Sequence, residues 1–144
     1  MEPILKVADL SKAFSRAGRD AFFAVDHVSF EVQPGEILGI GGESGSGKAT
    51  IARLITRQID ATGGQIFIDG QDITRLRGRD LIPVYAKIQM VFQSPADSFD
   101  PRRTLGDGIC ESLRNKGVPK AEREAKARAL LESCGLPDTF LARY

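Results

Sequence analysis

The feature that most constrains the fold is a glycine-rich loop set between a short apolar run and a helical pattern. The run EILGIGG covers residues 36–42 and is apolar enough for a strand buried on both faces. The loop follows over residues 42–50, with the sequence GESGSGKAT. After it, apolar residues recur at helical spacing, at Ile51, Leu54, Ile55 and Ile59. Strand, glycine loop and helix in this order predict an α/β fold.

The loop fits the pattern G-x-x-x-x-G-K-[ST] except at its last position, where Ala49 replaces a hydroxyl residue. Glycines let successive N–H groups point at a phosphate, and the helix that follows adds its partial positive charge. Lys48 can reach the β- and γ-phosphates, whereas the residue at position 49 normally offers its hydroxyl to Mg²⁺. The candidate nucleotide site consists of Gly42, Ser44, Gly45, Ser46, Gly47, Lys48, Ala49 and Thr50.

Two other interpretations of this loop are weaker. A Gly/Ser-rich turn that binds nothing would not need a buried run before it and a helix after it, and both are present. A dinucleotide-binding G-x-G-x-x-G fails because Ser44 or Thr50 stands where the third small residue belongs. NAD and FAD are therefore disfavoured.

The rest of the chain predicts an antiparallel layer and a helical end. Residues 4–10 and 27–32 are short β-type runs, and QIFIDG, residues 65–70, is a strand that closes in an Asp-Gly turn. KIQMVFQ, residues 87–93, is a further apolar run, and SPADSFDP after it is a loop. From Thr104 the pattern turns helical, with a break at KGVP, residues 116–119.

Charge and cysteine content exclude several classes of function. A net charge of +1 gives no broad attraction to nucleic acid or to an anionic membrane. Cys110 and Cys134 lack the spacing of a metal cluster or a disulfide framework, so reduced thiols are expected. No signal peptide and no run of ~18 apolar residues is present, so a partner would have to carry the protein to a membrane.

Three segments together resemble the nucleotide-binding subunit of an ATP-binding cassette (ABC) transporter. They are GGESGSGKAT, the preceding LSKAF and FAVDHVSFEVQPGEILGI, and the following IQMVFQSPADSFDPRRTLGD. The resemblance is greatest to the importers of oligopeptides, dipeptides and nickel. It implies a partial ABC ATPase domain, with a β-layer and P-loop core at 1–93 and a Q-loop and helical subdomain at 94–144.

The resemblance also implies ligands and roles. ATP and Mg²⁺ are the expected cofactors, and Gln93 matches the glutamine that contacts Mg²⁺ and the attacking water and senses the membrane subunit. Phe14 matches the aromatic residue that stacks on adenine, although Phe22 or Phe23 could take that role. Thr50 matches a hydroxyl near the α-phosphate.

The implied partners are a second ATP-binding subunit and transmembrane permease subunits, at the cytoplasmic face of the cell membrane; nucleic acid is not expected. No residue matches the family's signature loop, Walker B aspartate, catalytic glutamate or switch histidine. We therefore expect no hydrolysis by this chain alone, and an open edge at residues 36–42 that favours self-association. Two alternatives are a non-enzymatic fragment that binds nucleotide weakly and a small P-loop kinase.

Overall fold

The computed structural model describes residues 1–15, 17–18 and 20–144. The chain forms two compact units, Met1–Val84 and Tyr85–Tyr144, and each is described by itself. The boundary predicted from the sequence at 93/94 separates a β-layer and P-loop core from a Q-loop and helical subdomain, and it stays a prediction.

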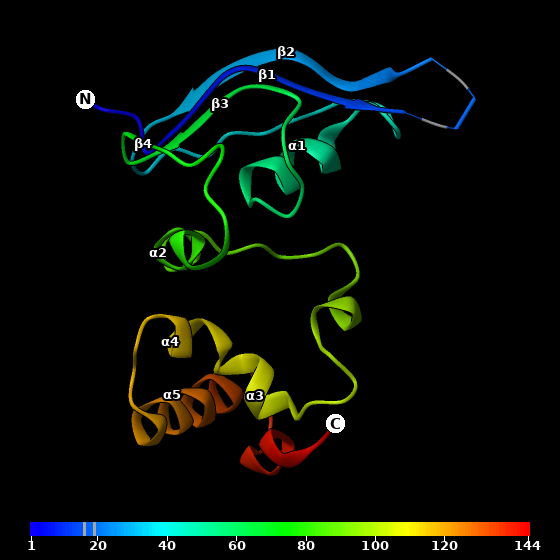
Figure 1. Ribbon diagram of the computed structural model, residues 1–144. Coiled ribbons are helices and arrows are strands. Elements are labelled where there is room, and N and C mark those ends of the chain that lie inside the picture. The colour runs from blue at the N-terminus through cyan, green and yellow to red at the C-terminus, as the bar shows by residue number, and fades with distance from the viewer. Residues whose placement is uncertain (16, 19) are drawn as a thin grey trace. The chain divides into compact units, whose positions relative to one another are not determined.

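The first unit is built on a four-stranded antiparallel sheet of order β2-β1-β3-β4 (Figure 1). Strand β1 spans Leu5–Phe14 and pairs with β2, Phe22–Val32, on one side and with β3, Gly63–Ile68, on the other. Strand β4 is the short Gln71–Asp72. The sheet confirms the predicted antiparallel layer.

The Asp-Gly turn predicted after β3 is present. Asp69 and Gly70 have φ of 48° and 76°, and Ile68 pairs with Gln71 across the turn. Positive φ at both central residues is the geometry of a type I′ hairpin, whose twist suits antiparallel strands. Asp and Gly are favoured at these positions because they adopt this conformation at low cost.

Helix α1, Lys48–Ile55, lies along one face of the sheet (Figure 1). It buries Ile51 and Leu54, as the helical spacing predicts. The other buried apolar side chains of this unit come from the strands and from the segment after β4: Val7, Leu10, Val25, Ile66, Ile68, Ile73, Leu81 and Val84. A short 3-10 turn, η1 at Gly78–Leu81, leads into helix α2, Ile82–Tyr85.

The strand predicted at residues 36–42 and the apolar run at residues 87–93 are not strands in the structure. Residues 36–42 and 87–93 lack strand geometry, and most of their apolar side chains are exposed, Ile37 at 97% and Val91 at 93%, although Ile88 and Met90 are half-buried. An apolar run becomes a buried strand only when neighbouring strands pair with its backbone and other layers cover its faces. Within the described residues no strand pairs with either segment, so the expectation of a buried strand at residues 36–42 is wrong for this chain.

The second unit is helical. It contains η2 at Pro95–Ser98, α3 at Leu105–Ile109, α4 at Glu111–Asn115, α5 at Lys120–Ser133 and η3 at Asp138–Ala142. The Thr104 side chain caps α3 by accepting a hydrogen bond from the Asp107 N–H. The helical pattern after Thr104 is thus two short helices that meet at Cys110.

Helix α5 forms where the sequence predicts it. It begins after Pro119, and Gly135 follows it with φ of 73°, the left-handed conformation that glycine adopts at helix ends. Glu122 and Lys126 form an ion pair at 2.9 Å, and Glu124 pairs with Lys120, 3.9 Å away. None of the helices in the described part of the chain is long and apolar enough to span a membrane.

Candidate nucleotide-binding site

The glycine loop ends in the first turn of α1. Gly47 caps the helix with φ of 93°, and its carbonyl accepts the first helical hydrogen bond, from the N–H of Ile51 at 3.0 Å. The N–H groups of Lys48, Ala49 and Thr50 precede that bond and have no partner within the helix. They form a set of donors at the positive end of the helix dipole, which suits an anionic ligand.

The Lys48 side chain folds back over the loop. Its ammonium donates to the carbonyl oxygens of Gly42 at 2.5 Å and Glu43 at 2.6 Å, and to Ser46 Oγ at 3.2 Å. A phosphate oxygen carries negative charge and is a stronger acceptor than a carbonyl oxygen. The ammonium can therefore exchange these bonds for phosphate oxygens at the same loop.

Space requires glycine at position 47, whereas a side chain at position 42 would meet only the end of the Ser46 side chain. A Cβ at Gly42 would lie 2.6 Å from Ser46 Oγ, and a Cβ at Gly47 would collide with the carbonyl oxygen of Ala24 in β2. The loop therefore packs directly on the backbone of β2. Gly45 has φ of 82° but open space around it, so its requirement is conformational.

Two of the three candidate aromatic residues form a pair at the end of the β1–β2 hairpin. Phe14 and Phe22 lie opposite each other in the antiparallel register, with ring centroids 5.9 Å apart and ring planes 32° apart. Phe14 is 37% exposed and Phe22 is 47% exposed. Both rings are thus accessible to a ligand.

Register places this pair on the sheet face that carries α1. A Cβ at Gly47 would lie 3.7 Å from a methyl group of Val25, so Val25 faces the loop and helix. Lys12 lies opposite Val25, and paired residues share a face. Phe14, two residues after Lys12 on the same strand, also points to that face.

An extra residue in β2 keeps Phe22 on this face as well. Lys12 pairs with Val25 and Ala13 pairs with Phe23, which leaves Ala24 as a bulge. Phe23, opposite Ala13, faces the other side of the sheet. The structure thus brings Phe14 and Phe22 together beside the glycine loop and separates Phe23 from them.

The residues fit the phosphates of a nucleotide better than they fit Mg²⁺. Free amides and a lysine at the start of α1 provide donors and a positive charge for phosphate oxygens. At position 49 the exposed methyl group of alanine cannot coordinate a metal, although the half-buried Thr50 follows it. Gln93, the other predicted metal ligand, is exposed and belongs to the second unit.

Sequence reasoning missed Lys12, whose ammonium lies 5.2 Å from the centroid of the Phe14 ring. The available signal was its spacing of two residues from Phe14, which puts both side chains on one face of a strand. The bulge at Ala24 had no comparable signal, because it arises from the pairing of two strands.

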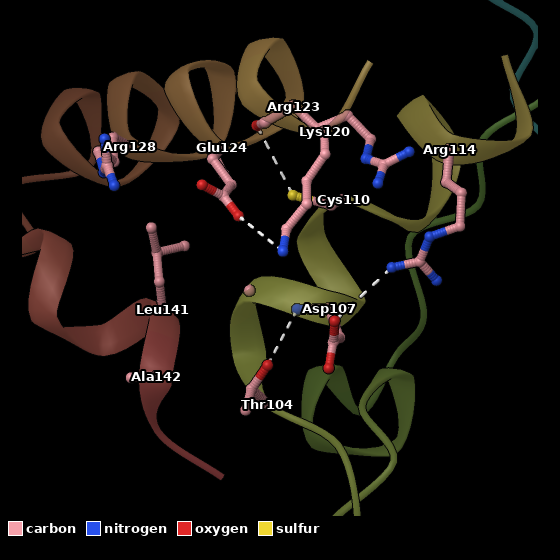
Figure 2. Close-up of a pocket in the computed structure, with 12 residues that line it drawn as sticks. Thr104, Asp107, Cys110, Arg114, Lys120, Arg123, Glu124, Arg128, Leu141 and Ala142 are labelled. Atoms are coloured by element: carbon pink, nitrogen blue, oxygen red, sulfur yellow. Dashed lines mark hydrogen bonds and ion pairs between the residues drawn. The ribbon is translucent and has the colours of Figure 1, made fainter. Parts of the chain in front are cut away.

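The second unit has a charged pocket of about 320 Å³ between α3, α5 and η3 (Figure 2). Glu124 pairs with Lys120, Asp107 pairs with Arg114 at 3.6 Å, and the Arg123 guanidinium donates to the Val118 carbonyl at 3.0 Å. Most of the cations at this pocket are therefore already partnered, and we assign no ligand to it.

Comparison with known proteins decides the family. The model of the ABC transporter family matches residues 25–143, which is most of the chain. The chain belongs to the ABC transporter family. Its glycine loop, helix α1 and the helices of the second unit all fall within the matched residues.

The similar proteins include ATP-binding subunits of importers. A protein named as a peptide import ATP-binding protein in Brucella ovis is 41% identical over 99% of this chain and 45% of its own length. The glutathione import ATP-binding protein GsiA of Shigella dysenteriae is also 41% identical, over 99% of this chain and 24% of its own length. This ABC chain therefore spans less than half the length of either relative.

Solved structures confirm the fold as part of an ABC ATPase domain. A dimeric ATP-binding cassette in a post-hydrolysis state, bound to ADP and Pi, aligns with a TM-score of 0.82 at 25% identity. The alignment covers 96% of this chain and 60% of that one. Another ATP-binding cassette of an ABC transporter aligns with a TM-score of 0.70 at 27% identity, over 99% of this chain and 58% of the other.

Proposed function

We propose that this chain binds ATP through residues 42–50, as the nucleotide-binding part of an ABC importer subunit. The observation that carries the proposal is the position of the Lys48 ammonium, which the Gly42 and Glu43 carbonyls hold over the loop immediately before α1. A cation and the free amides of a helix start converge there, and this combination suits a chain of phosphates.

Each predicted residue has a proposed role. Lys48 contacts the β- and γ-phosphates, and the amides of Gly45 to Thr50 contact phosphate oxygens. Phe14, with Phe22 beside it, stacks on the adenine ring, a contact between aromatic rings worth about 0.5–1.5 kcal/mol. The Thr50 hydroxyl lies near the α-phosphate, and Gln93 senses the membrane subunit.

Mg²⁺, when bound, would neutralise charge on the β- and γ-phosphates. This chain offers it an incomplete set of ligands, because Ala49 stands at the position of a hydroxyl. Gln93 remains a proposed ligand. The binding proposal itself depends on the loop and Lys48 and needs no metal.

The solute is proposed to be a peptide or a peptide-like compound. The names of the relatives, which describe import of peptides and of glutathione, support this class. Nickel rests on the sequence resemblance alone. We further propose that the whole subunit pairs with a second ATP-binding subunit, as the dimeric cassette does, and docks on permease subunits at the cytoplasmic face of the membrane.

Equilibrium titration with ATP tests the proposal. We expect saturable binding that inorganic tripolyphosphate competes away, because both ligands place phosphates in the same loop. A titration without saturable binding would contradict the proposal and favour the alternative of a fragment without nucleotide affinity. The family assignment already argues against the other alternative, a small P-loop kinase.

A further inference from the structure

Lys12 connects the aromatic pair to the segment that follows helix α1. Its ammonium donates a hydrogen bond to the backbone carbonyl of Asp60 at 2.6 Å, and it also lies 5.2 Å from the centroid of the Phe14 ring. A cation within about 6 Å of an aromatic centroid is attracted by the electrons of the ring. The ammonium therefore attracts the Phe14 ring while it is itself bonded to the Asp60 carbonyl.

The anchor at Asp60 is itself held in place. Its carboxylate accepts hydrogen bonds from the guanidinium groups of Arg57 and Arg77, each at 3.0 Å. The Arg57 guanidinium also donates to the carbonyls of Ile59 at 3.2 Å and Leu76 at 3.0 Å. The carbonyl that binds Lys12 thus belongs to a backbone segment fixed on several sides.

The Phe14 ring needs such an anchor because it lies at the end of a hairpin and is partly exposed. Its neighbour Phe22 is more exposed still, so solvent reaches both rings. A ring already held in one orientation loses less side-chain entropy when a ligand stacks on it. An anchored Phe14 therefore favours binding of a flat base.

Lys12 is unlike Lys48 in what it contacts. The Lys48 ammonium is bonded within the glycine loop, whereas the Lys12 ammonium is bonded to Asp60 and lies beside an aromatic ring. This difference separates two functions of the same side-chain type. Lys48 is placed to contact phosphates at the glycine loop, and Lys12 contacts the Phe14 ring.

We propose that Lys12 is a positioning residue that holds Phe14 for stacking on the nucleotide base, and so sets the preference of the site for a nucleotide over an inorganic polyphosphate. This inference rests on the proposed function, since it requires that Phe14 contacts the base. It goes beyond the stacking role of the aromatic residue, because it assigns the selectivity for the base to a lysine outside the glycine loop.

The test compares the affinities for ATP and for inorganic tripolyphosphate, both measured with a metal chelator. Tripolyphosphate has the phosphates without the base, so its affinity reports the glycine loop alone. In Lys12→Met we expect ATP affinity to fall about two- to fivefold, with tripolyphosphate affinity unchanged. Lys6→Met is the matched control: it removes a lysine of the same strand that pairs with Glu31 at 3.5 Å, and it should change neither affinity.

Lys12→Gln provides a second variant in case Lys12→Met does not fold. Glutamine keeps a donor for the Asp60 carbonyl but removes the charge beside the ring, so the loss for ATP should persist. Tripolyphosphate binding at wild-type affinity shows that either variant is folded. In a Phe14→Leu background, replacing Lys12 should have no further effect on the ratio of the two affinities.

Three results would overturn the inference. An equal loss of affinity for both ligands in Lys12→Met would mean that the lysine acts on the phosphates or on the loop. An unchanged ratio of the ATP and tripolyphosphate affinities in Lys12→Met would mean that Phe14 stacks on the base without Lys12. Equal affinity of the wild-type chain for ATP and tripolyphosphate would show that the base makes no contact, although the phosphates still bind. Failure to bind either ligand would contradict the proposed function itself.

Discussion

Gly47 lies so close to the backbone carbonyl of Ala24 that no side chain fits between them. The contact joins the start of helix α1 to strand β2, two residues along that strand from Phe22. Strand β2 therefore positions both the glycine loop and the aromatic pair. A change at Gly47 must displace either the loop or the strand.

Gly47→Ala should weaken both folding and ATP binding more than Gly45→Ala does. Both glycines have positive φ, so an alanine at either position costs about 1–2 kcal/mol in backbone strain. Only at Gly47 does the new methyl group also meet backbone, which adds roughly 1–3 kcal/mol. Thermal unfolding and ATP titration of the two variants measure the difference. Equal effects would show that the contact with Ala24 does not position the loop.

Ala49→Ser should raise the affinity for Mg·ATP more than the affinity for ATP with a chelator. The new hydroxyl supplies an oxygen ligand that the alanine cannot offer. The same substitution about one turn later in α1, Ala52→Ser, serves as the control and should leave the ratio of the two affinities unchanged. Equal gains with and without Mg²⁺ for Ala49→Ser would show that the hydroxyl acts on phosphate or on folding.

Arg57→Met should destabilise the chain far more than Arg77→Met, although both arginines bind the Asp60 carboxylate at 3.0 Å. The Arg57 side chain is 2% exposed and also serves two backbone carbonyls, whereas that of Arg77 is 76% exposed. The hydrogen bond from Arg57 is the main cause that lowers the pKa of Asp60 below its usual value. We expect a loss of about 1.5–3 kcal/mol for Arg57→Met and under about 1 kcal/mol for Arg77→Met. Urea unfolding measures both, and similar losses would contradict this explanation.

These 144 residues alone should release no phosphate from ATP above background. Phosphoryl transfer to water requires a group that orients the water and donors that stabilise the charge that develops, and we identify neither among the residues at the glycine loop. Phosphate release from the purified chain, with Lys48→Ala as the control for contaminating ATPases, measures this. Turnover that disappears in the control would mean that a carboxylate of this chain, such as Glu43 or Asp97, is catalytic.

Sequence patterns predicted those parts of the fold that depend on local chemistry. The turn at Asp69 and Gly70, the buried positions of α1 and the break between helices at residues 116–119 all follow from residue preferences over a few positions. The apolar run at residues 36–42 gave the wrong expectation, because its burial depends on pairing with distant strands. Ile37 is exposed for this reason, although its sequence context is typical of a buried strand.

The candidate site likewise contains some residues that local sequence predicts and others that depend on strand pairing. Gly42, Gly47 and Lys48 could be found from their spacing, since the loop is continuous in sequence. The choice between Phe22 and Phe23 could not be made from sequence, because the bulge at Ala24 decides which ring faces the loop. Residue spacing therefore predicts the glycine loop as the candidate site and leaves its aromatic partner open.

The most direct test of ATP binding at residues 42–50 is the dissociation constant for ATP of Lys48→Ala, compared with those of the wild-type chain and of Lys116→Ala. Lys116 is an exposed residue at the end of α4, so its replacement controls for the loss of one positive charge. We predict a loss of about 1.5–3 kcal/mol in binding free energy for Lys48→Ala, the range for a hydrogen bond to a charged group, and no change for Lys116→Ala. An unchanged dissociation constant in Lys48→Ala would show that ATP does not bind at residues 42–50.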